Sequence, residues 1–359
     1  MLFEEPILQW LLQNGGFMDS QVFILNEKRN VTLTAYLQDD SQEFWRAKKR
    51  PAVVIFPGGA YAYCSDREAD PVAQEYLRAG YHAFVLRYSV GWENAVWPNP
   101  LEDYDQAMEL IAAHAKEWHL IPEKIAVIGF SAGGHLAACA ATMAKHRPAA
   151  AILAYPVILE GLAAICAKGA PGADKAVDSQ TCPCFIAATG TDTTVSAMNS
   201  LRFVEALYEN GISAELHLYA FGPHGFSTAR TSIADPAELC SRTLHWVEDS
   251  ISWLEDVFGA FTSGEMSSPR CPGRVRKDKD PYLSVDCLLA TIAENQIAVE
   301  RLNQLILVEE TTQKWIAEQK ENLLTSEMTL RSALQFLNVP GEVIRKADEI
   351  LSEIPNRKQ

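Results

Sequence analysis

From residue 50 to about residue 258, short apolar runs alternate with longer segments of helical periodicity. Most of these runs lack polar alternation, which predicts strands covered on both faces, as in a parallel sheet. Two earlier runs, at 22–25 and 31–37, predict an antiparallel start to the sheet; the second alternates as a half-exposed strand does. The later strands are predicted at 52–56, 83–87, 125–129, 149–155, 184–189 and 214–219.

Helix-start signals lie between the strands. The pairs Asp70-Pro71, Asn99-Pro100 and Asp235-Pro236 each place a capping side chain before a proline at the first helical position. They predict helices at roughly 70–79, 100–118 and 235–257, with two more at 132–145 and 196–210. Alternation of strands and helices of this kind predicts a doubly wound, mostly parallel α/β sheet over residues 1–258.

The composition changes after residue 258. Residues 259–281 are rich in Gly, Pro, Ser and basic side chains, which is typical of a linker. Residues 282–359 read as all helix. A heptad rhythm with Asn295 at one seam position predicts a helix at the start of this segment. A second pair of helices is predicted at 327–353, with the turn between them at Val339-Pro340-Gly341. Two interpretations stay open: a helical hairpin or oligomerisation arm, or an amphipathic tail that packs on its own α/β domain. The heptad positions are Leu288, Ile292, Val299, Leu302 and Ile306.

Charge and composition exclude several classes of function. The net charge is −15 with 21% charged residues, which disfavours nucleic acid and anionic membrane surfaces as partners. The basic cluster at 270–279 lacks the aromatic side chains of an RNA site. Glu4, Glu5 and Pro6 stand where a secretory signal needs basic and apolar residues, and no apolar run reaches the ~20 residues that span a bilayer. We therefore expect a cytoplasmic protein.

The eight cysteines do not indicate a metal site. They lie at positions 64, 139, 166, 182, 184, 240, 271 and 287, without zinc-type spacing. In a reducing compartment they are expected to be free thiols, several of them in the core. No metal site is predicted from these cysteines.

The segment from Gly129 to Gly134 carries the strongest chemical signal. It reads Gly-Phe-Ser131-Ala132-Gly133-Gly, directly after an apolar strand and before a helix-forming run. A GxSxG sequence alone is a weak signal, but a strand–turn–helix context is what a nucleophile elbow requires. The small residues allow a sharp turn that exposes the Ser131 hydroxyl, and the Ala132 amide is placed to donate to an oxyanion.

A nucleophilic serine needs a base and an acid that orients it. Of eight histidines, His224 lies in a glycine-flanked loop after the last predicted strand, where parallel sheets keep their sites. Asp192 follows the strand at 184–189 and is the predicted acid, with Asp174 and Asp178 as weaker substitutes. His135 could line the pocket floor, but it is expected to be a satisfied packing histidine. The order Ser131, Asp192, His224 is the order of α/β-hydrolases.

The second oxyanion donor is expected in the loop after the strand at 52–56. This loop reads Pro57-Gly58-Gly59-Ala60-Tyr61. Adjacent glycines let backbone N–H groups converge on a negative oxygen with no side chain in the way. We predict the amides of Gly59 or Ala60, together with Ala132.

With these motifs in place, the chain resembles bacterial α/β-hydrolase esterases of the acetyl esterase and acetylxylan/feruloyl esterase type, near the hormone-sensitive-lipase group. The resemblance covers about residues 50–257 and implies hydrolysis of short acyl esters, often acetyl groups on sugars, without a cofactor. It also implies a cap at about 157–182. Pro57 stands where many relatives have histidine, Ala60 where glycine is common, and Ser196 where proline is frequent. The matching segments are PGGAY, Asp66-Arg-Glu-Ala, Arg87-Tyr-Ser-Val90, Pro98-Asn-Pro-Leu-Glu-Asp103, GFSAGGH, Thr191-Asp-Thr-Thr-Val195 and Gly222-Pro-His-Gly-Phe226.

The sequence therefore predicts a serine carboxylesterase acting on a small ester, with an acetylated sugar as one candidate substrate. Two alternatives stay open. A peptidase or amidase uses the same triad. A scaffold assembled through residues 282–359 would need no chemistry at Ser131. The 282–359 segment is also the candidate for joining identical subunits.

Overall fold

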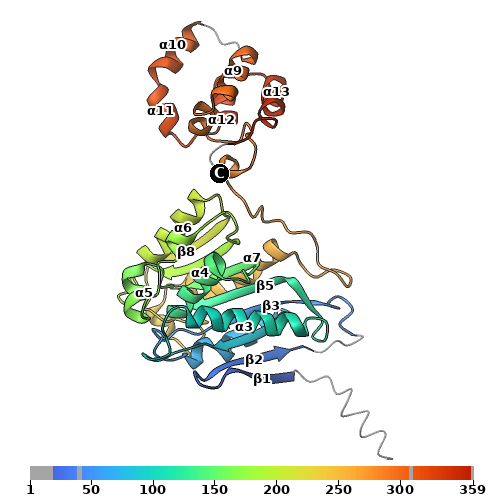
Figure 1. Ribbon diagram of the computed structural model, residues 1–359, viewed down its shortest axis with the longest axis vertical. Coiled ribbons are helices and arrows are strands. Elements are labelled where there is room, and N and C mark those ends of the chain that lie inside the picture. Colours follow the sequence, from blue (N-terminus) through green and yellow to red (C-terminus); the bar gives the residue numbers. More distant parts are fainter. Residues whose placement is uncertain (1–18, 39–42, 307–309, 357–359) are drawn as a thin grey trace, which may run out of the picture. The chain divides into compact units, whose positions relative to one another are not determined.

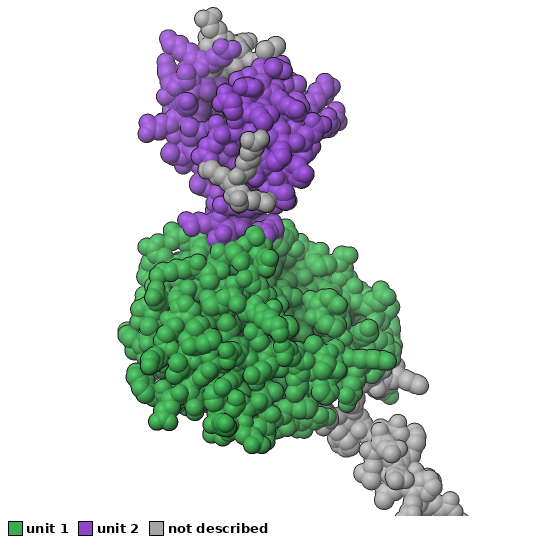
Figure 2. Space-filling model, viewed as in Figure 1, with its two compact units in different colours: residues 1–207, 213–273 green, residues 208–212, 274–359 purple. Residues whose placement is uncertain are grey.

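The computed structural model describes residues 19–38, 43–306 and 310–356. The acidic N-terminal residues used above to predict the absence of a secretory signal lie outside this range. Contacts divide the chain into two units, one of residues 1–207 and 213–273 and the other of residues 208–212 and 274–359 (Figure 2). The boundary at 273/274 lies inside the segment that the sequence indicates as a linker. No described helix is long and apolar enough to cross a membrane.

An eight-stranded sheet is the centre of the first unit, in the order β1-β2-β4-β3-β5-β6-β7-β8 (Figure 1). β1 pairs antiparallel with β2, and β2 pairs antiparallel with β4. The other neighbours run parallel. The predicted doubly wound, mostly parallel sheet with an antiparallel start is confirmed. The strands are β1 (Asp19–Asn26), β2 (Val31–Leu37), β3 (Arg50–Phe56), β4 (His82–Arg87), β5 (Leu120–Phe130), β6 (Ala150–Ala154), β7 (Cys184–Thr189) and β8 (Ala214–Tyr219).

Burial explains the patterns read from the sequence. β2 alternates buried and half-buried residues, whereas β3 and β7 are buried along their whole length. Helices cover both faces of the sheet: α4 (Ala132–Met143) packs on β3, β5 and β6, and α2 (Asp70–Arg78) packs on β3 and β4. α7 (Trp246–Phe258) packs on β6 and β7. The remaining long helices are α3 (Asn99–His114) and α6 (Met198–Glu209).

The predicted helix at 235–257 is wrong in its first half. Asp235 does cap a turn, because its carboxylate accepts from the Ala237 amide, but that turn is a 3₁₀ segment, Pro236–Glu238. The Cys240 amide then donates to the Phe221 carbonyl instead of continuing a helix. A second 3₁₀ turn, Ser241–His245, precedes α7. A contact with a distant loop therefore overrides the local helical pattern.

Two predicted helix caps are also wrong. Asp70 and Asn99 are the first residues of α2 and α3, and neither helix has a side-chain cap hydrogen bond. The Asn99 side-chain Nδ2 donates instead to the Asn94 carbonyl, 3.0 Å away. The prolines that follow still mark where the two helices begin, because proline fits the first helical turn.

The second unit corrects the predicted heptad helix. Among its described residues, the chain from 289 forms short helices with their own core. Asn295 is not a seam residue: it caps α9, where its side chain accepts from the Ala298 amide. The turn at Val339-Pro340-Gly341 is confirmed. The helices are α8 (Leu289–Ala293), α9 (Gln296–Leu305), α10 (Glu310–Glu318), α11 (Lys320–Thr325), α12 (Leu330–Phe336) and α13 (Gly341–Leu351).

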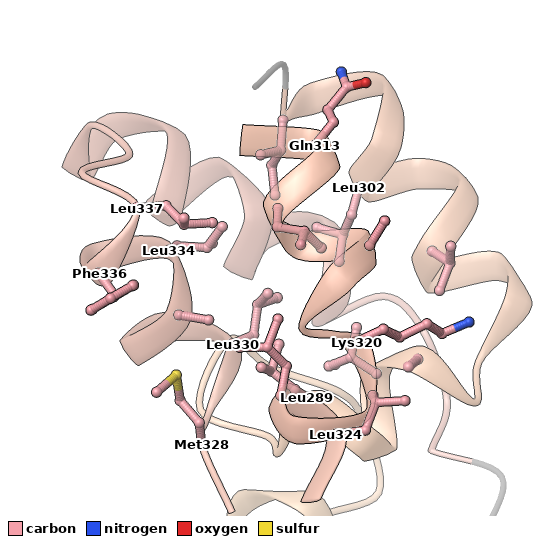
Figure 3. Close-up of a pocket in the computed structure, with 18 of the residues that line it drawn as sticks. Leu289, Leu302, Gln313, Lys320, Leu324, Met328, Leu330, Leu334, Phe336 and Leu337 are labelled. Atoms are coloured by element: carbon pink, nitrogen blue, oxygen red, sulfur yellow. The ribbon is translucent and has the colours of Figure 1, made fainter. Parts of the chain in front are cut away.

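A cavity of about 430 Å³ lies between the helices of this unit (Figure 3). Leucines such as Leu289, Leu302 and Leu330 form its walls, and the amine of Lys320 points away from them. Trp315 and Phe336 also line it and remain 37% and 66% exposed, with their rings stacked 5.9 Å apart. An exposed apolar surface of this kind marks an interaction site more often than chance.

Candidate active site

A strained turn between β5 and α4 carries Ser131. Its φ of 53° and ψ of −116° are unusual for a residue with a side chain. The turn packs so tightly that only glycine fits around it: a Cβ at Gly129 would lie 2.1 Å from the Gly133 carbonyl oxygen. A Cβ at Gly133 would lie 2.1 Å from the carbonyl oxygen of Phe56 on β3. This packing holds the serine at the carboxyl edge of the sheet.

Ser131, His224 and Asp192 form one hydrogen-bonded chain. His224 Nε2 lies 2.9 Å from Ser131 Oγ, and His224 Nδ1 lies 2.6 Å from Asp192 Oδ2. The three side chains come from loops after β5, β7 and β8, whose carboxyl ends share one edge of the sheet. The imidazole is 18% exposed and the carboxylate 1% exposed, so the imidazole is accessible and the carboxylate is sheltered. This geometry suits proton transfer from a serine hydroxyl.

The Asp192 carboxylate is held in its charged form. Burial favours the neutral acid and would raise its pKa. The hydrogen bond with His224 and those from the backbone amides of Val195 and Thr194 outweigh burial, so the pKa lies below the usual 3.8. Both amides donate to Oδ1, at 2.9 and 2.8 Å, which leaves Oδ2 for the imidazole. The carboxylate is thus fixed in orientation as well as in charge.

The two weaker candidate acids are placed elsewhere. Asp178 forms a two-pronged ion pair with Arg147, at 2.6 and 2.9 Å. Asp174 lies in a 3₁₀ turn, Asp174–Ala176. The carboxylate that the structure brings to His224 is Asp192, as the sequence predicts.

The predicted oxyanion loop lies beside Ser131. A Cβ built at Gly58 would be 3.1 Å from the Ser131 Cβ. Gly59 has a φ of 123° and Ala60 a φ of 54°, so the backbone turns in a region that suits glycine. Within the described part of the chain, the amides of Gly59, Ala60 and Ala132 donate to no protein acceptor. They are therefore available to a negatively charged oxygen.

His135 is a buried histidine that joins three segments around the site. Its Nδ1 lies 2.9 Å from the Tyr61 hydroxyl, and its Nε2 lies 2.8 Å from the Pro171 carbonyl oxygen. A carbonyl only accepts, so Nε2 carries the proton and Nδ1 accepts from Tyr61. This ties the oxyanion loop and the predicted cap to α4. This placement agrees with the predicted packing role.

Glu68 and Tyr155 are two residues that the sequence reasoning missed. Both are buried and hydrogen-bonded to each other, and they contact the loops that carry Gly58 and His224. The one sequence signal was indirect. Glu68 belongs to the Asp66-Arg-Glu-Ala segment of the family resemblance, but nothing local indicated that its side chain turns inward.

Two buried histidines make stability depend on pH. Burial lowers the pKa of His135 and of His82 to about 4, against 6.5 for free histidine. Between about pH 4 and 6.5 the unfolded chain then binds more protons than the folded chain. The free energy of unfolding should therefore fall as the pH falls through this window, by about 1.4 kcal/mol per pH unit for each histidine at most. Urea titrations between pH 7.5 and 4.5 measure this slope.

Glutamine at His82 or His135 should flatten that slope, because the titrating group is gone. His245 is exposed and serves as the matched control, so His245→Gln should keep the wild-type slope. An unchanged slope in both buried variants would contradict the assignment.

The chain is similar in sequence to a known protein family and to several known proteins. The family described as BD-FAE matches residues 43–157. Endo-1,4-beta-xylanase B of Butyrivibrio fibrisolvens is 31% identical over 259 residues, which is 63% of this chain and 38% of that protein. Acetylxylan esterase of Xylanibacter ruminicola is 29% identical over 197 residues, 49% of this chain and 41% of that protein. The chain thus spans about two fifths of these curated relatives.

A solved structure matches over nearly its whole length. MGS-M1, an α/β hydrolase enzyme from a Medee basin deep-sea metagenome library, is 41% identical with a TM-score of 0.61. The match covers 67% of this chain and 98% of that one.

Proposed function

Because the chain belongs to the α/β-hydrolase esterases of the acetyl and feruloyl esterase type, we propose that it is a serine carboxylesterase for short acyl esters. The observation that carries this proposal is the hydrogen-bonded chain from Ser131 through His224 to Asp192, at 2.9 and 2.6 Å. A serine in this arrangement loses its proton to the imidazole as it attacks, which turns a weak nucleophile into a strong one.

The proposed reaction is a two-step acyl transfer. Ser131 Oγ attacks the ester carbonyl carbon while His224 Nε2 takes the hydroxyl proton, giving a tetrahedral alkoxide. The alkoxide collapses as His224 returns that proton to the leaving alcohol, and an acyl-enzyme remains. Water then attacks the acyl-enzyme, His224 again acts as base, and the acid leaves while Ser131 regains its proton. Asp192 keeps the imidazole oriented and stabilises its charged form.

The alkoxide is expected to sit on backbone amides. The amides of Gly59 or Ala60 come from the loop after β3, and that of Ala132 comes from the first residue of α4. Hydrogen bonds that strengthen as negative charge develops lower the barrier, and losing one such donor costs roughly 10² to 10³ in rate. These donors belong to the backbone, so the loop conformation decides whether they are in place.

Acetyl groups on sugars are the proposed substrate class. The support is the acetylxylan esterase among the relatives and the family resemblance of the loops around Ser131. The test is a panel of acetylated xylo-oligosaccharides, p-nitrophenyl acetate and butyrate, and a peptidyl p-nitroanilide, measured with the wild type and Ser131→Ala. Faster cleavage of the anilide than of the esters would favour the peptidase alternative. No labelling of Ser131 by a fluorophosphonate would favour a scaffold.

For the second unit we propose self-association. The supporting observation is the apolar cavity surface with exposed Trp315 and Phe336, which a second copy of the chain would cover. The cytoplasmic location expected from the sequence stays a prediction.

Deleting residues 282–359 should leave catalysis intact and abolish self-association. The match to a solved hydrolase uses 67% of this chain and 98% of the hydrolase, so that fold stands without such an extension. We expect kcat/KM on p-nitrophenyl acetate within about twofold of the full chain. Light scattering should show an oligomer for the full chain and a monomer for the truncation.

Point variants distinguish the proposed surface from a general effect of the tail. Trp315→Ser with Phe336→Ser should also give a monomer. Val22→Ser, which removes a 65% exposed apolar side chain from β1, should not. A full chain that is already monomeric overturns the proposal.

A further inference from the structure

A buried carboxylate lies close behind the oxyanion loop. Glu68 ends a 3₁₀ turn, Asp66–Glu68, and is only 3% exposed. Its Oε2 accepts from the Gly58 amide at 2.8 Å, and its Oε1 accepts from the Tyr155 hydroxyl at 2.7 Å. The Arg67 guanidinium pairs only weakly with this carboxylate, because its Nε lies 4.0 Å from Oε1 and its side chain is 51% exposed. Hydrogen bonds from neutral donors are therefore the main compensation for burying this charge.

Tyr155 continues the connection to the histidine loop. It follows β6 with a φ of 37° and is 1% exposed. Its hydroxyl donates to Glu68 and accepts from the Ser227 amide at 2.9 Å, just beyond His224. Its ring meets the imidazole of His224 edge to face, with the ring centres 4.9 Å apart. Burial, followed by the charge of Glu68, raises the pKa of Tyr155 well above 10, so the hydroxyl keeps its proton as a donor.

A second bond joins the same two segments. The Ser227 hydroxyl donates to the Arg67 carbonyl at 2.5 Å. The 3₁₀ turn that carries Glu68 is therefore joined to the histidine loop directly at Ser227 and indirectly through Tyr155, and its carboxylate is bonded to the oxyanion loop at Gly58. The glycine at position 58 makes the last bond feasible, because a Cβ there would lie 2.6 Å from Glu68 Oε2.

We propose that Glu68 and Tyr155 are positioning residues: their hydrogen-bonded bridge holds the oxyanion loop and the histidine loop in register with Ser131. The inference rests on the proposed esterase function and adds to it the means by which donors and base are aligned. In the described structure neither side chain hydrogen-bonds to Ser131 or to the His224 imidazole, and Tyr155 meets that imidazole only through its ring. The bridge acts through the Gly58 amide, next to the predicted oxyanion donors, and through the backbone and ring contacts of the His224 loop.

A positioning role and a purely structural role for this bridge predict different kinetic effects. The loop positions matter most when the alkoxide forms, so loss of the bridge should lower kcat and leave KM nearly unchanged. A trifluoromethyl ketone, which adds Ser131 to give a tetrahedral alkoxide, should lose affinity in parallel. A residue that only supports the fold would instead lower the unfolding temperature without moving the inhibitor constant.

The test uses Glu68→Gln, Tyr155→Phe and the double variant of the full chain. Glutamine cannot accept from both the Gly58 amide and the Tyr155 hydroxyl, and phenylalanine keeps the ring but not the hydroxyl. Each single variant should lower kcat on p-nitrophenyl acetate by about 10 to 100-fold and raise the trifluoromethyl ketone Ki by a similar factor. The kcat of the double variant should be close to that of the less active single variant, because both substitutions break the same bridge.

Tyr76→Phe is the matched control. Tyr76 is also fully buried, and its hydroxyl bonds to Ser250 Oγ at 2.8 Å on α7. This variant should keep kcat within about twofold. Should Glu68→Gln fail to fold, Tyr155→Phe decides the question alone. The bridge is overturned if the wild type hydrolyses esters and is labelled at Ser131 while the variants match its kcat and Ki. A wild type without activity or labelling would instead overturn the proposed function.

Discussion

Replacing Ser131 by alanine should lower kcat on p-nitrophenyl acetate by about 10⁶-fold, close to the rate left by binding and the oxyanion donors alone. The hydroxyl is the atom that bonds to the substrate carbon, and its hydrogen bond to His224 Nε2 at 2.9 Å supplies the route for its proton. Alanine removes the nucleophile but keeps the strained turn, so circular dichroism and the unfolding temperature should match the wild type.

The matched control for this variant is Ser250→Ala. Ser250 is buried on α7 and bonds to Tyr76, away from the hydrogen-bonded chain of Ser131, His224 and Asp192. We expect its kcat within about twofold of the wild type. Adding His224→Ala to Ser131→Ala should cost little more, because residues that act as one unit are not additive. Full activity in Ser131→Ala would end the serine mechanism for this protein.

Asp192→Asn should lower kcat by about 10⁴-fold, although it changes one oxygen to nitrogen. The amides of Thr194 and Val195 both donate to Oδ1, so the carboxamide oxygen will occupy that position. The NH₂ group then faces His224 Nδ1 and donates to it. This forces the tautomer that carries its proton on Nε2, which cannot accept the proton of Ser131.

Two further carboxylates provide the control for Asp192. Asp174 and Asp178 were the other candidate acids, and Asp178 pairs with Arg147. Asp174→Asn and Asp178→Asn should each keep kcat within about twofold, because neither carboxylate bonds to His224 in the described structure. A loss in one of them comparable to that of Asp192→Asn would move the role of the acid to that residue.

Most of the α/β fold could be predicted because its signals are local. The buried runs of β3 and β7 and the alternation of β2 follow from which faces are covered, and side-chain periodicity reports this directly. The turn at Ser131 could be predicted for the same reason. A side chain at Gly129 or Gly133 would collide with backbone close to the serine, so the sequence shows glycine at both positions.

Periodicity misled where short helices are ended by other contacts. The apolar positions from Leu288 to Ile306 follow a heptad, but Asn295 caps α9 and breaks the run. The helix predicted from Asp235 likewise gives way to 3₁₀ turns, because the Cys240 amide bonds to Phe221. A pattern of apolar residues cannot show which backbone groups find partners outside the helix.

By itself the sequence determined the strands of the sheet, the elbow at Ser131 and the chain order in which Asp192 and His224 follow it. Only the tertiary structure decided that Asp192 and not Asp178 meets the imidazole, that His135 joins Tyr61 to Pro171, and that Glu68 turns inward to Tyr155. The physical reason is the range of the interactions. Burial of one face of a strand or helix makes apolar residues recur at a regular spacing in the sequence. A hydrogen bond between side chains on different loops depends on three-dimensional placement and produces no such repeat.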